Sequence, residues 1–169
     1  MSVLIRPVQS ARREINIPDT YLKGQFFESY IREYLFPKDK YTLLEKTHSY
    51  LENKEDFVFS SKNPDFKFKS ESGKTFFLEA KYRSYFFDGA IEWCKFYQLS
   101  HYREVDRIAP VYVVIGIDGQ PDDPDRLFLL PLKVIKGDKL FRSTLQLYEI
   151  PAKKCVSENQ LDQMVISSC

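Results

Sequence analysis

The sequence predicts an α/β fold in which helices flank a mixed β-sheet. A helical stretch over 20–36 precedes strand-like segments that continue to Arg83, and a second helical stretch precedes an apolar strand at 111–117. This order of helix, three strands, helix and strand is typical of a sheet covered on both faces. We therefore expect an α/β sandwich.

Length and composition fit one domain. The chain has 169 residues, of which 43% are apolar and 29% charged, as in globular proteins. We expect a single domain over 1–169, with its core at 20–117 and additional strands and a tail at 118–169. The 25 basic and 24 acidic residues leave a net charge of +1, so any nucleic-acid contact must come from a local basic patch.

The sequence predicts neither export nor membrane insertion. The longest clearly apolar run, 111–117, is too short to span a bilayer, and the N-terminal segment has no apolar stretch of signal-peptide length. The three cysteines are odd in number and far apart, which argues against disulfides and a thiolate zinc site. We expect a cytoplasmic protein that does not contact membranes.

The first helix is predicted over 20–36 and ends before Pro37. Its apolar residues are three and four positions apart, as on a buried helical face. These residues are Phe27, Ile31, Tyr34 and Leu35. The next stretch, 38–56, has no pattern that predicts an element.

Three strands are predicted next. The first is short, over 57–59, and the second, over 65–69, alternates apolar and charged residues. A turn at 70–73 then leads into a third strand over 75–83, which returns antiparallel to the second.

The second half of the chain predicts a helix and further strands. The helix, over 89–108, ends before a proline, and the apolar run 111–117 predicts a strand covered on both faces. Strands are also predicted at 127–130 and 145–150. The tail from Val156 either frays or packs as a short helix.

The third strand carries the candidate chemistry. Its alternation places Glu79 and Lys81 on one face, with Cα atoms roughly 6.6 Å apart. A carboxylate in so apolar a segment needs a cation, which is either Lys81 or a metal ion. The hairpin can bring Asp65 beside Glu79 if a bulge adjusts its two arms. Two such carboxylates suit Mg²⁺ or Mn²⁺, and the alternative is a structural ion pair on a solvated sheet face.

Two further features favour a site. Glu28 lies on the helical stripe of Ile31 and Leu35, so it either faces the sheet and joins the cation or lies at the margin of the stripe and turns outward. Gln98 and Tyr102 are four residues apart on the later helix, so their side chains project side by side. An amide and a phenol suit hydrogen bonding to a carboxylate, a water or a phosphate.

Together these residues resemble the PD-(D/E)XK nuclease superfamily. A Pro-Asp at 64–65 is separated by thirteen residues from Glu-Ala-Lys at 79–81. Helical Glu28 is similar to the extra acidic residue of many members. The segment 98–102 resembles the Gln-x-x-x-Tyr motif of the RecB-type and lambda-exonuclease-like branch.

This resemblance implies a restriction-endonuclease-like αβββαβ core and a Mg²⁺-dependent deoxyribonuclease, with Mn²⁺ as an alternative metal. It also implies that metal is held by Asp65, Glu79, the Ala80 carbonyl and Glu28, with Lys81 as the catalytic cation. The implied catalytic set is Asp65, Glu79, Lys81, Glu28, Gln98 and Tyr102.

A local basic patch is predicted on the hairpin. Residues 62–83 contain six basic and three acidic side chains, and such a patch binds phosphates without reading base sequence. The aromatic residues at 82 and 85–87 either stack on unpaired bases or pack in the core. Candidate nucleic-acid contacts are Lys67, Lys69, Arg83 and Arg103.

The sequence therefore predicts a metal-dependent nuclease that hydrolyses phosphodiester bonds of DNA. The alternative is a catalytically inactive nucleic-acid-binding or assembly domain on the same fold. A chain of this length has little room for a separate recognition domain, so specificity is expected from a homodimer, a protein partner or DNA shape.

Overall fold

The structure, a computed structural model, describes residues 19–47 and 62–167. Its centre is a six-stranded sheet in the order β1-β2-β3-β5-β6-β8, in which only the β3–β5 pair is parallel. The prediction of a mixed sheet is therefore confirmed. The strands are β1 Tyr41–Lys46, β2 Phe66–Ser70, β3 Thr75–Arg83, β5 Val111–Ile117, β6 Arg126–Pro131 and β8 Glu149–Ile150.

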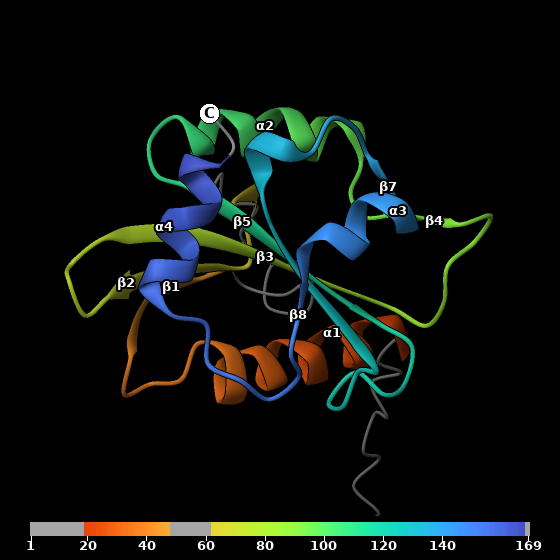
Figure 1. Cartoon of the computed structure of the whole chain (residues 1–169), viewed down its shortest axis with the longest axis horizontal. Coiled ribbons are helices and arrows are strands. Elements are labelled where there is room, and N and C mark those ends of the chain that lie inside the picture. Colours follow the sequence, from red (N-terminus) through yellow and green to blue (C-terminus); the bar gives the residue numbers. More distant parts are fainter. Residues whose placement is uncertain (1–18, 48–61, 168–169) are drawn as a thin grey trace, which may run out of the picture.

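Helices cover both faces of this sheet, and α1 and α2 lie on opposite sides of it (Figure 1). The first helix continues into a π-helical turn, η1, and the two together span the helix predicted over 20–36. Two single turns of 3₁₀-helix, η3 and η4, occur in the C-terminal part. The bounds are α1 Asp19–Tyr30, η1 Ile31–Leu35, α2 Phe96–Asp106, η3 Leu132–Val134, α3 Arg142–Leu145, η4 Gln146–Tyr148 and α4 Glu158–Ile166.

Strand alternation sorts the side chains of β3 between two cores. Phe76 and Leu78 join the core beneath α1 and α4, whereas Phe77 joins the core beneath α2. Glu79 and Lys81 have the same parity as Phe77, so they share its face, as the sequence predicts. The central strand β5 is buried along its whole length because both faces of the sheet are covered there.

The segment predicted as one helix over 89–108 differs in its first part. Residues Ala90–Glu92 form a strand, β4, which pairs antiparallel with β7, Lys139–Phe141, and the helix begins only at Phe96. Asp88 and Gly89 both have positive φ, so the chain turns sharply there and continues extended. The sequence did not predict this turn, because the apolar residues on both sides of it are spaced as on one helix.

Other predictions differ at the ends of the chain's elements. The strand predicted over 145–150 is reduced to Glu149–Ile150, since the residues before it form α3 and η4. The unassigned stretch 38–56 contains β1, and the tail forms α4, one of its two alternatives. The strand predicted over 57–59 lies outside the described residues.

The predicted bulge between the arms of the hairpin is wrong. The β2–β3 register runs unbroken from Lys69↔Thr75 to Phe66↔Leu78, and the irregularity lies instead between β1 and β2, at Leu43 and Glu45. Among the described residues, no helix combines the length and apolar character needed to cross a membrane.

Candidate active site

Asp65 and Glu79 lie side by side where β2 begins. The pairing of Phe66 with Leu78 places the preceding residue, Asp65, directly opposite Glu79. The Asp65 backbone N–H donates to Glu79 Oε2 at 3.2 Å, and the Ala80 N–H donates to Asp65 Oδ2 at 2.8 Å. The two acidic residues are therefore held together by the backbone N–H groups of Asp65 and Ala80.

The segment that carries Asp65 is fixed from both sides. At the end of β1, the Thr47 N–H donates to the Asp65 carbonyl at 2.9 Å, and Thr47 Oγ1 donates to the Pro64 carbonyl at 2.8 Å. On the α2 side, His101 Nε2 is hydrogen-bonded to Asn63 Oδ1 at 3.0 Å. These contacts add to the pairing of β2 with β3 in fixing the position of Asp65.

Lys81 is the cation nearest to Glu79. Its Nζ lies 2.5 Å from Glu79 Oε1, and Glu79 is only 1% exposed. Burial lowers the pKa of Lys81, but the charges of Glu79 and Asp65 outweigh burial and raise it overall, so the amine stays protonated. The buried carboxylate thus has the cationic partner that its burial requires.

Within the described part of the chain, no basic side chain forms an ion pair with Asp65. Burial, and then the charge of Glu79, raise the pKa of Asp65 well above its usual range, while Lys81 lowers it only in part. Tyr102 adds no charge, because burial and then the charges of Glu79 and Asp65 raise the pKa of its phenol. One lysine therefore does not fully compensate the two carboxylates, and a further positive charge beside them would be stabilised.

Glu28 and Gln98 lie at the same site with other partners. Glu28 Oε2 is 3.0 Å from Lys46 Nζ, and the charge of Glu28 still contributes to the raised pKa of Asp65. The side-chain oxygen of Gln98 accepts from the Lys95 N–H at 2.9 Å, which caps α2.

The oxygen atoms beside Lys81 form a donor set that suits a hard cation. Carboxylate oxygens of Asp65 and Glu79 are the ligands that Mg²⁺ and Mn²⁺ prefer. The Ala80 N–H points to the side of β3 where β2 has ended, and in a strand the carbonyl of the same residue points the same way. These three groups fit a hard cation. Within 19–47 and 62–167, however, no three His, Cys, Asp or Glu side chains converge on one point.

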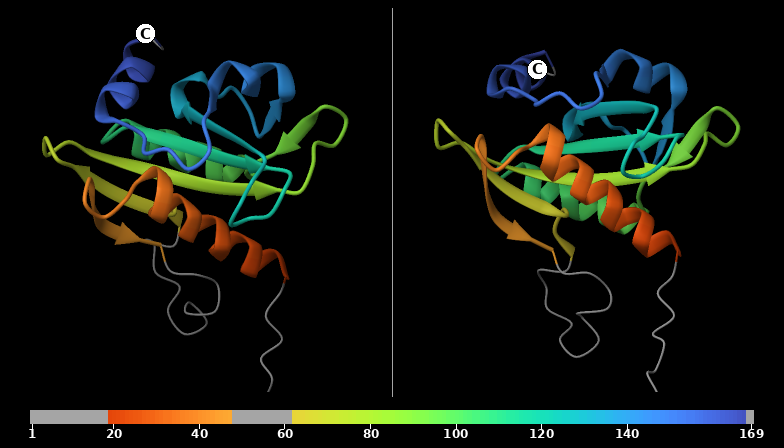
Figure 2. Two further views of the ribbon diagram at one scale, coloured as in Figure 1. Left: turned by 60° about the horizontal axis from the view of Figure 1, so that its bottom comes forward. Right: turned by 90° about the horizontal axis from the view of Figure 1, so that it is seen from below.

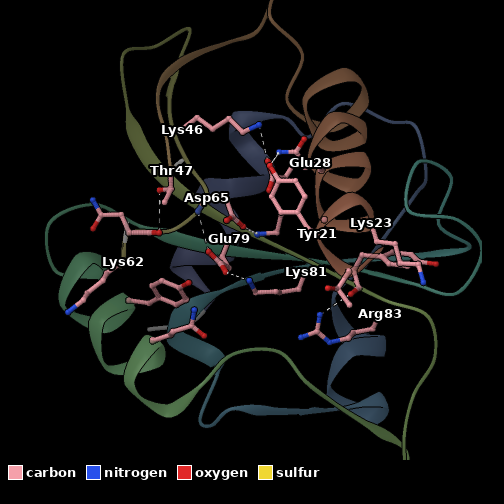
Figure 3. A pocket seen from close by; sticks show the side chains of 18 of the residues that line it. Tyr21, Lys23, Glu28, Lys46, Thr47, Lys62, Asp65, Glu79, Lys81 and Arg83 are labelled. Carbon is pink, nitrogen blue, oxygen red and sulfur yellow. Dashed lines mark hydrogen bonds and ion pairs between the residues drawn. The ribbon is translucent and has the colours of Figure 1, made fainter. Parts of the chain in front are cut away.

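These residues line a pocket of about 910 Å³ (Figure 3). It opens between α1, the ends of β1 and β2, and α2, and it also contains Gln98 and Tyr102. Three acidic side chains lie in the wall: Glu28, Asp65 and Glu79. Five basic ones accompany them: Lys23, Lys46, Lys62, Lys81 and Arg83.

Comparison with solved structures gives a match of fold. The chain is similar to Hjc from Archaeoglobus fulgidus, a Holliday junction resolvase from an archaeal hyperthermophile, with a TM-score of 0.51 and 14% sequence identity. The match covers 73% of this chain and 92% of that one. The fold is that of a resolvase-type nuclease. No family model matches the chain, and no curated protein does.

On this nuclease-like fold, the predicted nucleic-acid contacts are scattered. Arg83 lines the pocket and also donates twice to the Glu92 carbonyl, at 3.0 and 2.8 Å. Lys67, Lys69 and Arg103 do not line it. Lys67 pairs with a glutamate of β1 at 2.9 Å, and Arg103 donates to the Lys136 carbonyl at 2.9 Å.

Sequence reasoning missed several lining residues. Lys46 and Thr47 come from a stretch without a recognisable pattern, so no signal pointed to them. Lys23 lies five residues before Glu28, about 140° around the helix, so helical spacing did not point to it either.

Proposed function

We propose that this protein is a metal-dependent nuclease that hydrolyses phosphodiester bonds of DNA. The observation that carries the proposal is the meeting of Asp65, Glu79 and Lys81 in a pocket with a basic wall, on a nuclease-like fold. The motif residues thus stand in one place, and the surrounding charge suits a polyanion.

Asp65, Glu79 and the Ala80 carbonyl would hold Mg²⁺, or Mn²⁺ in its place. Glu28 lies at the same pocket and would join them through a water. When bound, the metal neutralises charge on the phosphoryl oxygens and makes a water more acidic.

The chain's own side chains supply the remaining chemistry. Lys81, a compact cation, stabilises the negative charge that develops on the phosphoryl group and orients the attacking water. Tyr102 lies in the same pocket wall, where its hydroxyl suits a hydrogen bond to a carboxylate, a water or a phosphate. Gln98, which caps α2, fixes the start of the helix that carries Tyr102.

The basic wall would bind the DNA backbone. Lys23, Lys46 and Lys62 lie on three different segments around the carboxylates, so they can contact successive phosphates without reading base sequence. The fold match to a Holliday junction resolvase supports a structured DNA as substrate, with specificity completed by a second copy or a protein partner.

The test is cleavage of supercoiled plasmid and single-stranded DNA in Mg²⁺. Asp65→Asn, Glu79→Gln and Lys81→Met each keep the shape of the side chain, and each is expected to lower the rate about 100-fold or more. Glu45→Gln, at an exposed position outside the pocket, is the matched control.

Equal rates in the wild type and all four variants would refute the assignment. A wild type that binds DNA tightly but does not cut either substrate would instead favour the inactive nucleic-acid-binding domain.

A further inference from the structure

Next to the pocket, three exposed aromatic side chains share one groove. Tyr85, Phe87 and Phe141 are 68%, 74% and 56% exposed, and they line a groove of about 670 Å³. Clustered exposed apolar side chains mark interaction sites more often than isolated ones do. Neither the proposed metal site nor either hydrophobic core uses these three rings.

The ribbon that carries the rings is braced. Figure 2 shows segment 84–90 extending past the end of the sheet before the chain turns back. Phe87 and Ala90 exchange backbone hydrogen bonds of 2.9 and 3.0 Å across the Asp88–Gly89 turn. Pairing of Ala90 with Phe141 then brings the third ring to the same place. The rings are thus held exposed by the backbone.

The groove is continuous with the candidate active site. Arg83 and Ser84 line both cavities. Since β3 rises roughly 3.3 Å per residue, Arg83 lies about 13 Å along the strand from Glu79. A strand of nucleic acid with a phosphate at Glu79 would reach the groove within a few nucleotides.

The structure separates rings that serve packing from those that do not. Phe86 packs against the core beneath α2 and under the Arg142 guanidinium, at 4.5 Å. Tyr82 donates its hydroxyl to the Gly119 carbonyl at 2.8 Å. Tyr85 and Phe87 are the members of this aromatic run that stay exposed.

The charged side chains that line the groove balance, and the excess of basic side chains lies in the adjoining pocket. Arg83 and Lys139 line the groove together with Asp88 and Glu92, and Glu92 already pairs with Lys95 at 2.6 Å. Exposed rings beside a pocket with five basic and three acidic side chains are the features with which proteins hold single-stranded nucleic acid. An apolar peptide would not need the basic residues.

We propose that Tyr85, Phe87 and Phe141 form a stacking platform for unpaired bases of the strand whose phosphate lies in the pocket. The platform rests on the proposed nuclease function and specifies its substrate class: nucleic acid with unpaired nucleotides beside the scissile phosphate. A fully paired blunt duplex offers no free base to these rings.

The experiment measures binding without cleavage. A 12-nucleotide single-stranded DNA with one 2-aminopurine is titrated with the full-length protein in EDTA, with the label moved along the strand, because stacking quenches its fluorescence. Tyr85→Ala and Phe87→Ala are each expected to weaken binding about 10-fold and to remove the quench. Tyr85→Phe and Leu147→Ala, the latter at an exposed apolar position away from the groove, should behave as wild type.

Three results would overturn the platform: wild-type affinity for the blunt duplex equal to that for the single strand, unchanged binding in the Tyr85→Ala/Phe87→Ala double variant, or a change in that variant's molar mass by light scattering, which would make the rings a contact between copies. Thermal melting checks that each variant folds.

The same measurements test the nuclease function independently of the stacking platform. If the wild type shows no Mg²⁺-dependent cleavage but quenches 2-aminopurine, the platform stands and the hydrolytic assignment is lost. If it cleaves DNA but none of the 2-aminopurine positions is quenched, the nuclease function stands and the stacking platform is lost.

Discussion

At the scale of single residues, the candidate site depends on how Glu79 is paired. Its carboxylate is nearly inaccessible, yet it pairs with Lys81 and accepts a hydrogen bond from the Asp65 backbone. Removing only one member of such a buried ion pair is costly, because the other charged group is left without its partner.

Lys81→Met should therefore destabilise the fold more than Glu79→Gln. The methionine leaves a buried carboxylate without its cation, for which we expect a loss of about 3 kcal/mol, whereas glutamine leaves a partly exposed amine. The double variant should recover about 1 kcal/mol or more relative to Lys81→Met. Urea unfolding of all four proteins measures this, and simple additivity would contradict the pairing.

Glu79→Gln should also remove metal binding. Calorimetric titration with Mn²⁺ is expected to show a site in the wild type and none in this variant, because one of the two carboxylates is lost. Glu45→Gln, which changes an exposed carboxylate outside the pocket, should leave the titration unchanged. A site that survives Glu79→Gln would place the metal elsewhere.

Cysteine reactivity reports on the core beside the site. Burial raises the pKa of Cys94 to about 11, so at pH 8 only about 0.1% of it is thiolate. In a Cys169→Ser background, iodoacetamide at pH 8 should label exposed Cys155 in the native protein and Cys94 only after unfolding. Peptide mass spectrometry checks the order, and rapid native labelling of Cys94 would show that this core opens.

At the scale of elements, strand β3 has both a structural and a chemical role. Its even-numbered residues, Phe76 and Leu78, pack beneath α1, and the odd-numbered Glu79 and Lys81 project into the pocket. The alternation of side chains along β3 therefore places apolar residues in the core and charged residues in the pocket. The neighbouring strand β5 secures this arrangement by letting α1 approach closely at Gly116.

Gly116→Ala should loosen the contact between α1 and β5. A Cβ there would meet the Phe27 ring at 2.5 Å, so the ring must move, at an expected cost of about 1–3 kcal/mol. Gly137→Ala is the matched control, because nothing lies within 4 Å of its added Cβ. Equal melting temperatures for the two variants would mean that α1 shifts freely.

At the scale of the whole molecule, the pocket forms where several elements end together. Strand β2 stops pairing with β3 at Leu78, and α1, β1 and α2 surround the exposed continuation of β3. A chain with a net charge of +1 thereby gathers five basic side chains at one cavity. Local concentration of charge replaces an overall basic composition.

Binding of DNA should accordingly depend on salt through the pocket. Lys62→Gln is expected to lower the slope of log K against log salt by about 0.7–0.9, because one phosphate contact is lost. Lys133→Gln, at an exposed position outside the pocket, should keep the wild-type slope. Fluorescence anisotropy at several salt concentrations distinguishes the two, and equal slopes would remove Lys62 from the interface.

The fold class was predictable because its signals are local. Hydrophobic spacing placed the helix over 20–36, and the unbroken apolar run placed β5, and both are confirmed. The helix predicted from residue 89 was wrong in its first part. The apolar residues there are compatible with either a helix or a strand, and only the pairing of β4 with β7 decides between them. Residues with no pattern, such as those of β1, acquire their structure from neighbouring β2.

The sequence by itself determined that Glu79 and Lys81 share a face, since strand alternation is a property of neighbouring residues. It also indicated a hairpin that can bring Asp65 to them, but with a bulge that the structure does not have. Only the tertiary structure decided which lysines surround them and that Phe141 joins Phe87 at one groove. These groupings bring together segments that are distant in the chain, because the two hydrophobic cores fix the positions of the elements around the sheet.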